Sequence, residues 1–229
     1  YILLNYSGTI SDVSTITHEA GHSMHSYFSR KAQPFHDSQY PIFLAEIAST
    51  FNEMLLMEAL LKEDQPKEEK ISTLAESLDR IFATLFRQVF FAAFELEIHT
   101  AAEKGIPLTE EFLSTTYRNL QHQFYGEIVT FDELSSIEWA RIPHFYYNFY
   151  VYQYATGIIA ALCFAEKVLS QEENALELYM TFLKSGGSDY PLNILKKSGV
   201  DMTTAIPMQK AFSFISKQIA TLTHLLTSS

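Results

Sequence analysis

The feature that most constrains this chain is the segment His18-Glu19-Ala20-Gly21-His22, whose two histidines can act together only on a helix. Residues four apart project from one helix face, one turn apart, so both imidazoles can bind a single tetrahedral Zn²⁺ ion. Glu19 can then orient and deprotonate a metal-bound water, whose pKa zinc lowers from about 15.7 towards about 7. Gly21 removes a side chain beside the site and suits the close approach of another element. A chance match is the alternative, and it is rare in a chain with eight histidines.

A third metal ligand is expected elsewhere, because catalytic zinc usually takes three protein ligands and leaves the fourth position to water. A longer zinc-protease motif would place a histidine six residues after His22, but Phe28 stands there. Glu46 lies among apolar residues near the start of the next predicted helix, and a buried carboxylate needs a metal or a cation beside it. We predict one zinc ion held by His18, His22 and Glu46, with an ordinary ion pair as the alternative for Glu46.

Two further residues lie near this set along the predicted helices. Glu53 falls seven positions after Glu46 on nearly the same helix face, where it could accept a hydrogen bond from a ligand histidine and fix its tautomer. The alternative for Glu53 is a solvated helix acid. His25 follows His22 by three residues and could compete as a ligand. Because it is two turns from His18, support behind a ligand or simple packing suits it better.

The rest of the sequence predicts a mostly α-helical chain. The sequence of residues 1–6 is typical of a short β-strand with no turn or cap before it, so we expect the chain to be a piece cut from a longer protein. No convincing strand and no linker follow, which favours a single domain over residues 1–229. Helical periodicity, caps and glycine ends predict helices that begin near residue 11 or 12 and end near 28, and that cover residues 42–61, 66–104, 110–125, 145–169, 172–184, 190–197 and 207–226.

Composition excludes several classes of partner. The formal net charge is −11, and we find no basic patch, which opposes binding to nucleic acid or to an anionic membrane surface. The apolar runs are too short to cross a bilayer. The single cysteine, Cys163, excludes an intrachain disulfide and favours a reducing compartment, with the cytoplasm as the default.

Three parts of the sequence together resemble oligoendopeptidase F, in the thimet-oligopeptidase group of zinc peptidases. They are HEAGHSMHSYF (18–28) with IFLAEIAST (42–50), then IPHFYYNFYVYQYATG (142–157), and a tail from GGS (186–188) to LKKSGVDM (195–202). The resemblance implies the C-terminal catalytic part of such an enzyme, a helical zincin domain of the gluzincin type. It assigns the zinc ligands to His18, His22 and Glu46 and the general base to Glu19. Ala20 departs from a bulkier residue, often leucine, which should affect packing rather than chemistry.

The resemblance also implies that a late histidine and tyrosines hold the substrate and stabilise the oxyanion. His144 is the matching histidine, and Tyr147 and Tyr150 would share a helix face with it. A buried aromatic stripe is the alternative for each tyrosine. In the family, a helical N-terminal half forms the opposite wall of a deep cleft that admits short peptides. That half would precede Tyr1, so we expect it as a partner, and the surface it covers as a cause of self-association.

The function that we expect is zinc-dependent endopeptidase activity on short unfolded peptides. The opening segment would form an edge strand beside the zinc helix and bind an extended substrate through Leu3, Asn5 and Tyr6. A related carboxypeptidase is the nearest alternative, and a helical binding module with a structural zinc is a more distant one. The basic residues near the motifs that could grip a terminal carboxylate are too few to decide: Arg30, Lys31 and Arg141.

Overall fold

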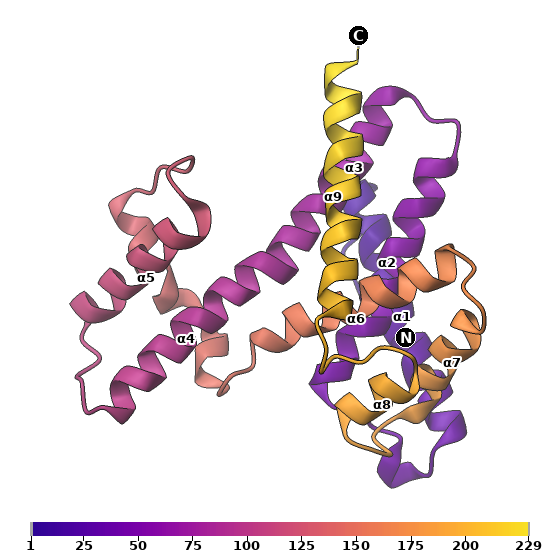
Figure 1. Cartoon of the computed structure of the whole chain (residues 1–229), viewed down its shortest axis with the longest axis horizontal. Coiled ribbons are helices and arrows are strands. Elements are labelled where there is room, and N and C mark those ends of the chain that lie inside the picture. Colours follow the sequence, from indigo (N-terminus) through magenta and orange to yellow (C-terminus); the bar gives the residue numbers. More distant parts are fainter. Residues whose placement is uncertain (1, 229) are drawn as a thin grey trace. The chain divides into compact units, whose positions relative to one another are not determined.

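The computed structural model describes residues 2–228, which form helices and no strand (Figure 1). Within this part of the chain, no helix is both long enough and apolar enough to cross a membrane. The helices are α1 (Ile10–Ala32), α2 (Ile42–Lys62), α3 (Lys67–Ile81), α4 (Arg87–Glu103), α5 (Glu110–Tyr125), α6 (Tyr152–Leu169), α7 (Ala175–Ser185), α8 (Pro191–Lys197) and α9 (Ile206–Thr227).

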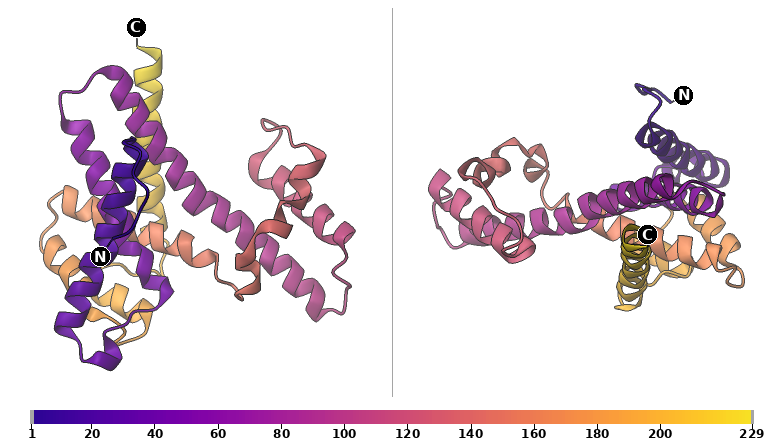
Figure 2. Two further views of the ribbon diagram at one scale, coloured as in Figure 1. Left: turned by 180° about the vertical axis from the view of Figure 1, so that it is seen from behind. Right: turned by 90° about the horizontal axis from the view of Figure 1, so that it is seen from above.

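The described residues divide into two compact units. One unit contains the residues up to Phe82 together with those from Thr156 onwards, and the other contains Ala83–Ala155. In the first unit α1 packs on α2 and α7, and α9 lies alongside α3 (Figure 2). The prediction of a mostly helical chain is confirmed, whereas a single domain over residues 1–229 stays a prediction.

The core of the first unit forms around α2, which is buried on most faces as its continuous apolar sequence predicts. Leu44, Ile47 and Met54 are almost fully buried on this helix, and Phe164 of α6 and Phe182 of α7 add large buried rings. On this helix Glu53 is buried and Glu46 is partly buried, with 6% and 22% of their side chains exposed. A carboxylate so far withdrawn from water needs a cation or a metal beside it.

Helix α1 begins at Ile10, slightly before the predicted residue 11 or 12, because Thr9 caps it. The Thr9 hydroxyl accepts the backbone N–H of Asp12 at 3.2 Å, and the Asp12 carboxylate accepts the N–H of Thr9 at 2.8 Å. This reciprocal capping box fixes the start of the helix. The helix also continues past Phe28 to Ala32, so its last turn carries Arg30 and Lys31.

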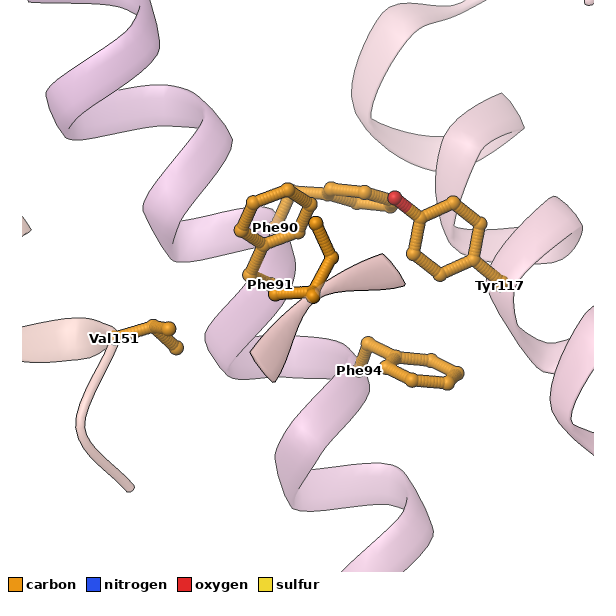
Figure 3. Close-up of a cluster of buried hydrophobic side chains, with 6 residues drawn as sticks. Phe90, Phe91, Phe94, Tyr117 and Val151 are labelled. Atoms are coloured by element: carbon orange, nitrogen blue, oxygen red, sulfur yellow. The ribbon is translucent and has the colours of Figure 1, made fainter. Parts of the chain in front are cut away.

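The core of the second unit is aromatic (Figure 3). Phe90, Phe91 and Phe94 of α4 are buried, and Phe90 and Phe94 each contact the ring of Tyr117 on α5. The Tyr117 hydroxyl donates to Glu138 at 2.7 Å, and burial together with this carboxylate raises the tyrosine pKa. These contacts join α4, α5 and the 3₁₀ segment Glu133–Arg141.

Two predicted helices are interrupted. The helix expected over residues 66–104 contains a π-helical segment at Phe82–Phe86, between α3 and α4. The helix expected over residues 145–169 is wrong in its first turns: a 3₁₀ turn covers Pro143–Tyr146, and α6 begins only at Tyr152. Between them Asn148 and Phe149 have φ values of 43° and 54°, a left-handed conformation that no right-handed helix accommodates.

The expected N-terminal edge strand does not form over Ile2–Tyr6, and Tyr1 lies outside the described residues. Leu3 and Tyr6 are 90% and 59% exposed, and the segment has no regular secondary structure. A strand requires a neighbouring strand to pair its backbone groups, and residues 2–228 supply none.

Candidate metal centre and active site

Two helices bring three ligand atoms together. The Nε2 atoms of His18 and His22 on α1 lie 3.2 Å apart, and Oε2 of Glu46 on α2 lies 3.3 Å and 3.6 Å from them, respectively. Ligands held tetrahedrally at about 2.0–2.1 Å from Zn²⁺ are about 3.3–3.4 Å apart, so the three atoms fit one ion. Within the described part of the chain, this is the one group of three or more potential ligands so arranged.

Gly21 explains how α1 and α2 come close enough to share an ion. A Cβ atom at this position would lie 2.5 Å from the carbonyl oxygen of Ala48 and 2.5 Å from the Cα of Ser49. Backbone cannot move aside as a flexible side chain does, so a larger residue would force the helices apart. The close approach expected from the sequence is confirmed. The contact joins Gly21, one residue before His22 on α1, to Ala48, two residues after Glu46 on α2, so it lies directly beside the ligand set.

A buried acid contacts His18, the first of the three candidate ligands. Oε1 of Glu53 lies 2.8 Å from Nδ1 of His18, and Glu53 is only 6% exposed. A carboxylate at Nδ1 holds the tautomer in which Nε2 is free to bind metal. Burial disfavours protonation of His18, but hydrogen bonds with Glu46 and Glu53 outweigh it and raise the pKa of His18 to about 9.

Arg80 on α3 in turn contacts Glu53, the acid that faces His18. Its Nη1 lies 3.3 Å from Oε1 of Glu53, and its Nη2 lies 3.0 Å from Oε1 of Glu76 one turn earlier on the same helix. The guanidinium therefore neutralises the buried carboxylate that faces His18. Arg80 was not predicted from the sequence, where its only signal is a basic residue on the inner face of an amphipathic helix.

His25 lies outside the ligand set and packs behind it. It is fully buried, its ring stacks on Tyr40 with 3.7 Å between centroids, and Phe182 lies 4.8 Å away. Neither ring nitrogen has a hydrogen-bond partner among residues 2–228. Burial, and secondarily the charge of His22, lowers the pKa of His25 to about 3, so this imidazole stays neutral.

Glu19 opens onto a groove that runs along α1. Together with His22 it lines one end of an open groove of about 600 Å³, and Ile2 of the N-terminal segment also contributes. Leu3, Asn5 and Tyr6, the expected peptide-binding residues, lie within four residues after Ile2 and are exposed. The groove continues along the last turns of the helix past Ser23, Ser26, Tyr27, Arg30 and Lys31.

In the second unit, a turn brings the predicted histidine and tyrosines close together. The ring centroid of His144 lies 6.3 Å from that of Tyr147 and 5.6 Å from that of Tyr150, and the two tyrosines are 6.0 Å apart. Tyr154 joins them, 6.2 Å from His144. The prediction that these residues share a helix face is wrong, because the left-handed residues before Tyr150 break the helix.

Glu95 holds that turn. Its carboxylate accepts the backbone N–H of Phe149 at 2.6 Å, and the side chain is fully buried on α4. Burial raises the pKa of Glu95. Glu95 was not predicted as a functional residue, although it is an acid within an apolar helical stretch, the same signal that indicates Glu46.

Comparisons with known proteins agree with this site. Residues 1–214 match Peptidase family M3. The chain is 43% identical over 226 residues to Oligopeptidase PepF of Bacillus subtilis, covering 99% of this chain and 34% of that protein. It is 45% identical to the chromosomal Oligoendopeptidase F of Lactococcus lactis subsp. cremoris, covering 99% of this chain and 38% of that protein. The chain thus spans little more than a third of these relatives' length.

Solved structures show the same relationship. The crystal structure of oligoendopeptidase-F from Enterococcus faecium has a TM-score of 0.85 and 46% identity, covering 95% of this chain and 39% of that one. A crystal structure from Chlamydophila abortus has a TM-score of 0.91 and 73% identity, covering 98% of this chain and 38% of that one. The resemblance to oligoendopeptidase F is confirmed, and the chain belongs to Peptidase family M3, a family of metallopeptidases.

Proposed function

We propose that this chain supplies the metal site and the general base of a zinc-dependent endopeptidase that cuts short unfolded peptides. The observation that carries this proposal is the spacing of 3.2–3.6 Å among the ligand atoms of His18, His22 and Glu46. Membership of family M3 and relatives named oligoendopeptidase F support peptides as the substrates. The N-terminal half as a partner, self-association of this piece and a cytoplasmic location remain predictions.

The chain's own residues have distinct tasks in this proposal. Zinc at the site would lower the pKa of a water molecule towards about 7 and polarise the scissile carbonyl. Glu19 lies on the ligand helix and lines the groove, so it can take the proton of the attacking water and return it to the leaving amine. Glu53 keeps Nδ1 of His18 hydrogen-bonded, which leaves Nε2 for the metal.

Two further groups are assigned to the substrate. His144 with Tyr147 and Tyr150 would hold it and donate hydrogen bonds to the oxyanion. Their support is the family resemblance and the close packing of their rings. In the second group, Leu3, Asn5 and Tyr6 would contact the peptide backbone. Their support is that they follow Ile2, which lines the groove beside Glu19.

Zinc content and peptide cleavage, measured together on the complete protein that carries this chain, test the proposal. We expect one zinc ion per chain and internal cuts in fluorogenic oligopeptides, with the products identified by mass spectrometry. Release of residues only from the peptides' C-terminal ends would favour the carboxypeptidase alternative. Bound zinc without any cleavage would favour a structural metal, which the three-ligand set does not support.

A further inference from the structure

The groove that begins at the metal site ends at two cations. Arg30 and Lys31, in the last turn of α1, line the same groove as Glu19 and His22. Both side chains are exposed, and no carboxylate in residues 2–228 pairs with either. The Lys31 ammonium instead lies 5.7 Å from the centroid of the Tyr27 ring, another groove residue.

Arg30 and Lys31 are neighbouring cations that no acid in residues 2–228 pairs with, in a chain whose formal net charge is −11. Several other basic residues of the first unit do pair with acids, as Arg80 does with Glu53 and Glu76. The overall charge repels an anionic peptide, so a basic pair creates a local region where a carboxylate is favoured. Arginine suits this task, because its planar guanidinium binds a carboxylate through two parallel hydrogen bonds.

The position of the pair sets a distance from the reacting bond. Arg30 follows His22 by eight residues, which is about 12 Å along a helix at 1.5 Å per residue. An extended peptide advances about 3.3 Å per residue, so this distance corresponds to roughly four residues. The length and flexibility of the two basic side chains widen that to about three to five.

We propose that Arg30 and Lys31 form a carboxylate-binding subsite, which selects peptides that carry a carboxylate about three to five residues from the bond to be cut. The inference rests on the proposed peptidase function and names a feature of its substrates. Both an acidic side chain and the peptide's C-terminus supply this chemical group. A C-terminal carboxylate would fix the number of residues between the cut and the end, whereas a side chain would not.

The same two residues also have a structural effect that must be separated from binding. Cations in the last turn of a helix interact favourably with its dipole. Their replacement can therefore lower the melting temperature with no substrate involved. Lys62 offers a matched control, because it is an exposed cation in the last turn of α2 and does not line the groove.

The experiment compares kcat/KM for one fluorogenic peptide core in four forms on the complete protein. Two forms have only neutral side chains and end in a free carboxylate or an amide; two amidated forms carry glutamate or glutamine four residues from the cut. In at least one of these two pairs, we expect the peptide that carries the carboxylate to have a kcat/KM about three- to tenfold higher than its neutral partner at low salt. The difference should shrink as salt rises. Arg30→Gln with Lys31→Gln should abolish the preference, and Lys62→Gln should keep it.

Binding of the same peptides to the Glu19→Gln protein, measured by fluorescence anisotropy, tests the preference for a carboxylate without turnover. Equal rates and equal binding for all four peptides, with the neutral amide still cut internally, would overturn the subsite and leave the proposed function intact. A preference that persists in the Arg30→Gln, Lys31→Gln protein would also overturn it. A zinc-loaded protein that cuts none of the peptides would instead refute the function, while anisotropy would still decide whether the pair binds carboxylates.

Discussion

Nδ1 of His18 lies 2.8 Å from the buried carboxylate of Glu53, which in turn lies 3.3 Å from the guanidinium of Arg80. Three helices thus contribute to one candidate metal ligand: α1 carries the imidazole, α2 the carboxylate and α3 the cation. Such partners fix the ring orientation and tautomer of a ligand histidine before metal arrives. The affinity for zinc should therefore depend on residues that never touch the ion.

Glu53→Gln should weaken zinc binding about 10- to 100-fold, because it replaces the charged acceptor behind His18. Arg80→Gln should weaken it less, and should add nothing in a protein that already carries Glu53→Gln, because the two act through one chain of contacts. Titration against a chelator of known affinity measures both effects. Glu76→Gln, which removes the other partner of Arg80, is the control. Additive losses from Glu53→Gln and Arg80→Gln would show that Arg80 acts by another route.

Glu46→Gln should remove most of the bound zinc, because an amide oxygen is a far weaker zinc ligand than a carboxylate. The substitution keeps the shape of the side chain, so the crossing of α1 and α2 at Gly21 should remain intact. Metal analysis after dialysis gives the zinc stoichiometry, and circular dichroism checks the helices. If the stoichiometry is unchanged, Glu46 is not a ligand.

Glu19→Gln in the complete protein should retain zinc and lose about 10²- to 10⁴-fold in kcat, because the amide cannot accept the proton of water. Zinc content and peptide turnover are to be measured on the same preparation. Activity within a few fold of the unmodified protein would rule out Glu19 as the base.

The candidate metal site is largely predictable from sequence because its determinants are local. The four-residue spacing of His18 and His22 and the glycine between them specify a helix face, and Glu46 stands out as an acid among apolar neighbours. Helix boundaries set by caps, such as Thr109 and Gly126 around α5, agree with the structure for the same reason.

The features that sequence did not predict depend on residues far apart in the chain. The left-handed turn at Asn148 and Phe149 is held by Glu95, more than fifty residues earlier. Arg80 meets Glu53 only because α3 packs on α2. The strand predicted at the start of the chain has a suitable sequence but no partner strand in residues 2–228. Periodicity describes one element at a time, so it cannot supply such pairings.

His25 should make the stability of the metal-free protein depend on pH. Burial lowers the pKa of His25 in the folded state to about 3 from an ordinary 6.5. Between pH 3 and pH 6.5 the unfolded state therefore binds more protons than the folded state. The stabilisation is present above pH 6.5 and is lost as the pH falls. The free energy of unfolding should drop by roughly 2 kcal/mol from pH 7 to pH 5 through this group.

Urea unfolding at both pH values, with EDTA present, measures this loss. His25→Phe should reduce the difference, since phenylalanine can keep the stack on Tyr40 without titrating. His36→Gln, at an imidazole that is 77% exposed, should leave it unchanged. An undiminished difference in the His25→Phe protein would mean that other groups carry the pH dependence.

Glu95 should control the turn that carries the histidine and tyrosine rings. Glu95→Ala removes the acceptor of the Phe149 N–H beside two consecutive left-handed residues, at a cost of about 1–3 kcal/mol in unfolding free energy. Trp139, the only tryptophan, packs against the same aromatic core and donates to Ser114 at 3.3 Å, so its fluorescence reports on this unit.

We expect Glu95→Ala to unfold at lower urea concentration by tryptophan fluorescence, to keep its zinc, and to lose kcat in the complete protein if His144, Tyr147 and Tyr150 act on the substrate. Glu97→Ala, at an exposed acid two residues along α4, controls for the loss of charge on the helix. Glu95→Gln separates the hydrogen bond from the charge, because its amide oxygen can still accept from Phe149. Recovery of stability and kcat by glutamine would assign the effect to the held turn, whereas full stability and full activity in Glu95→Ala would show that the turn needs no such anchor.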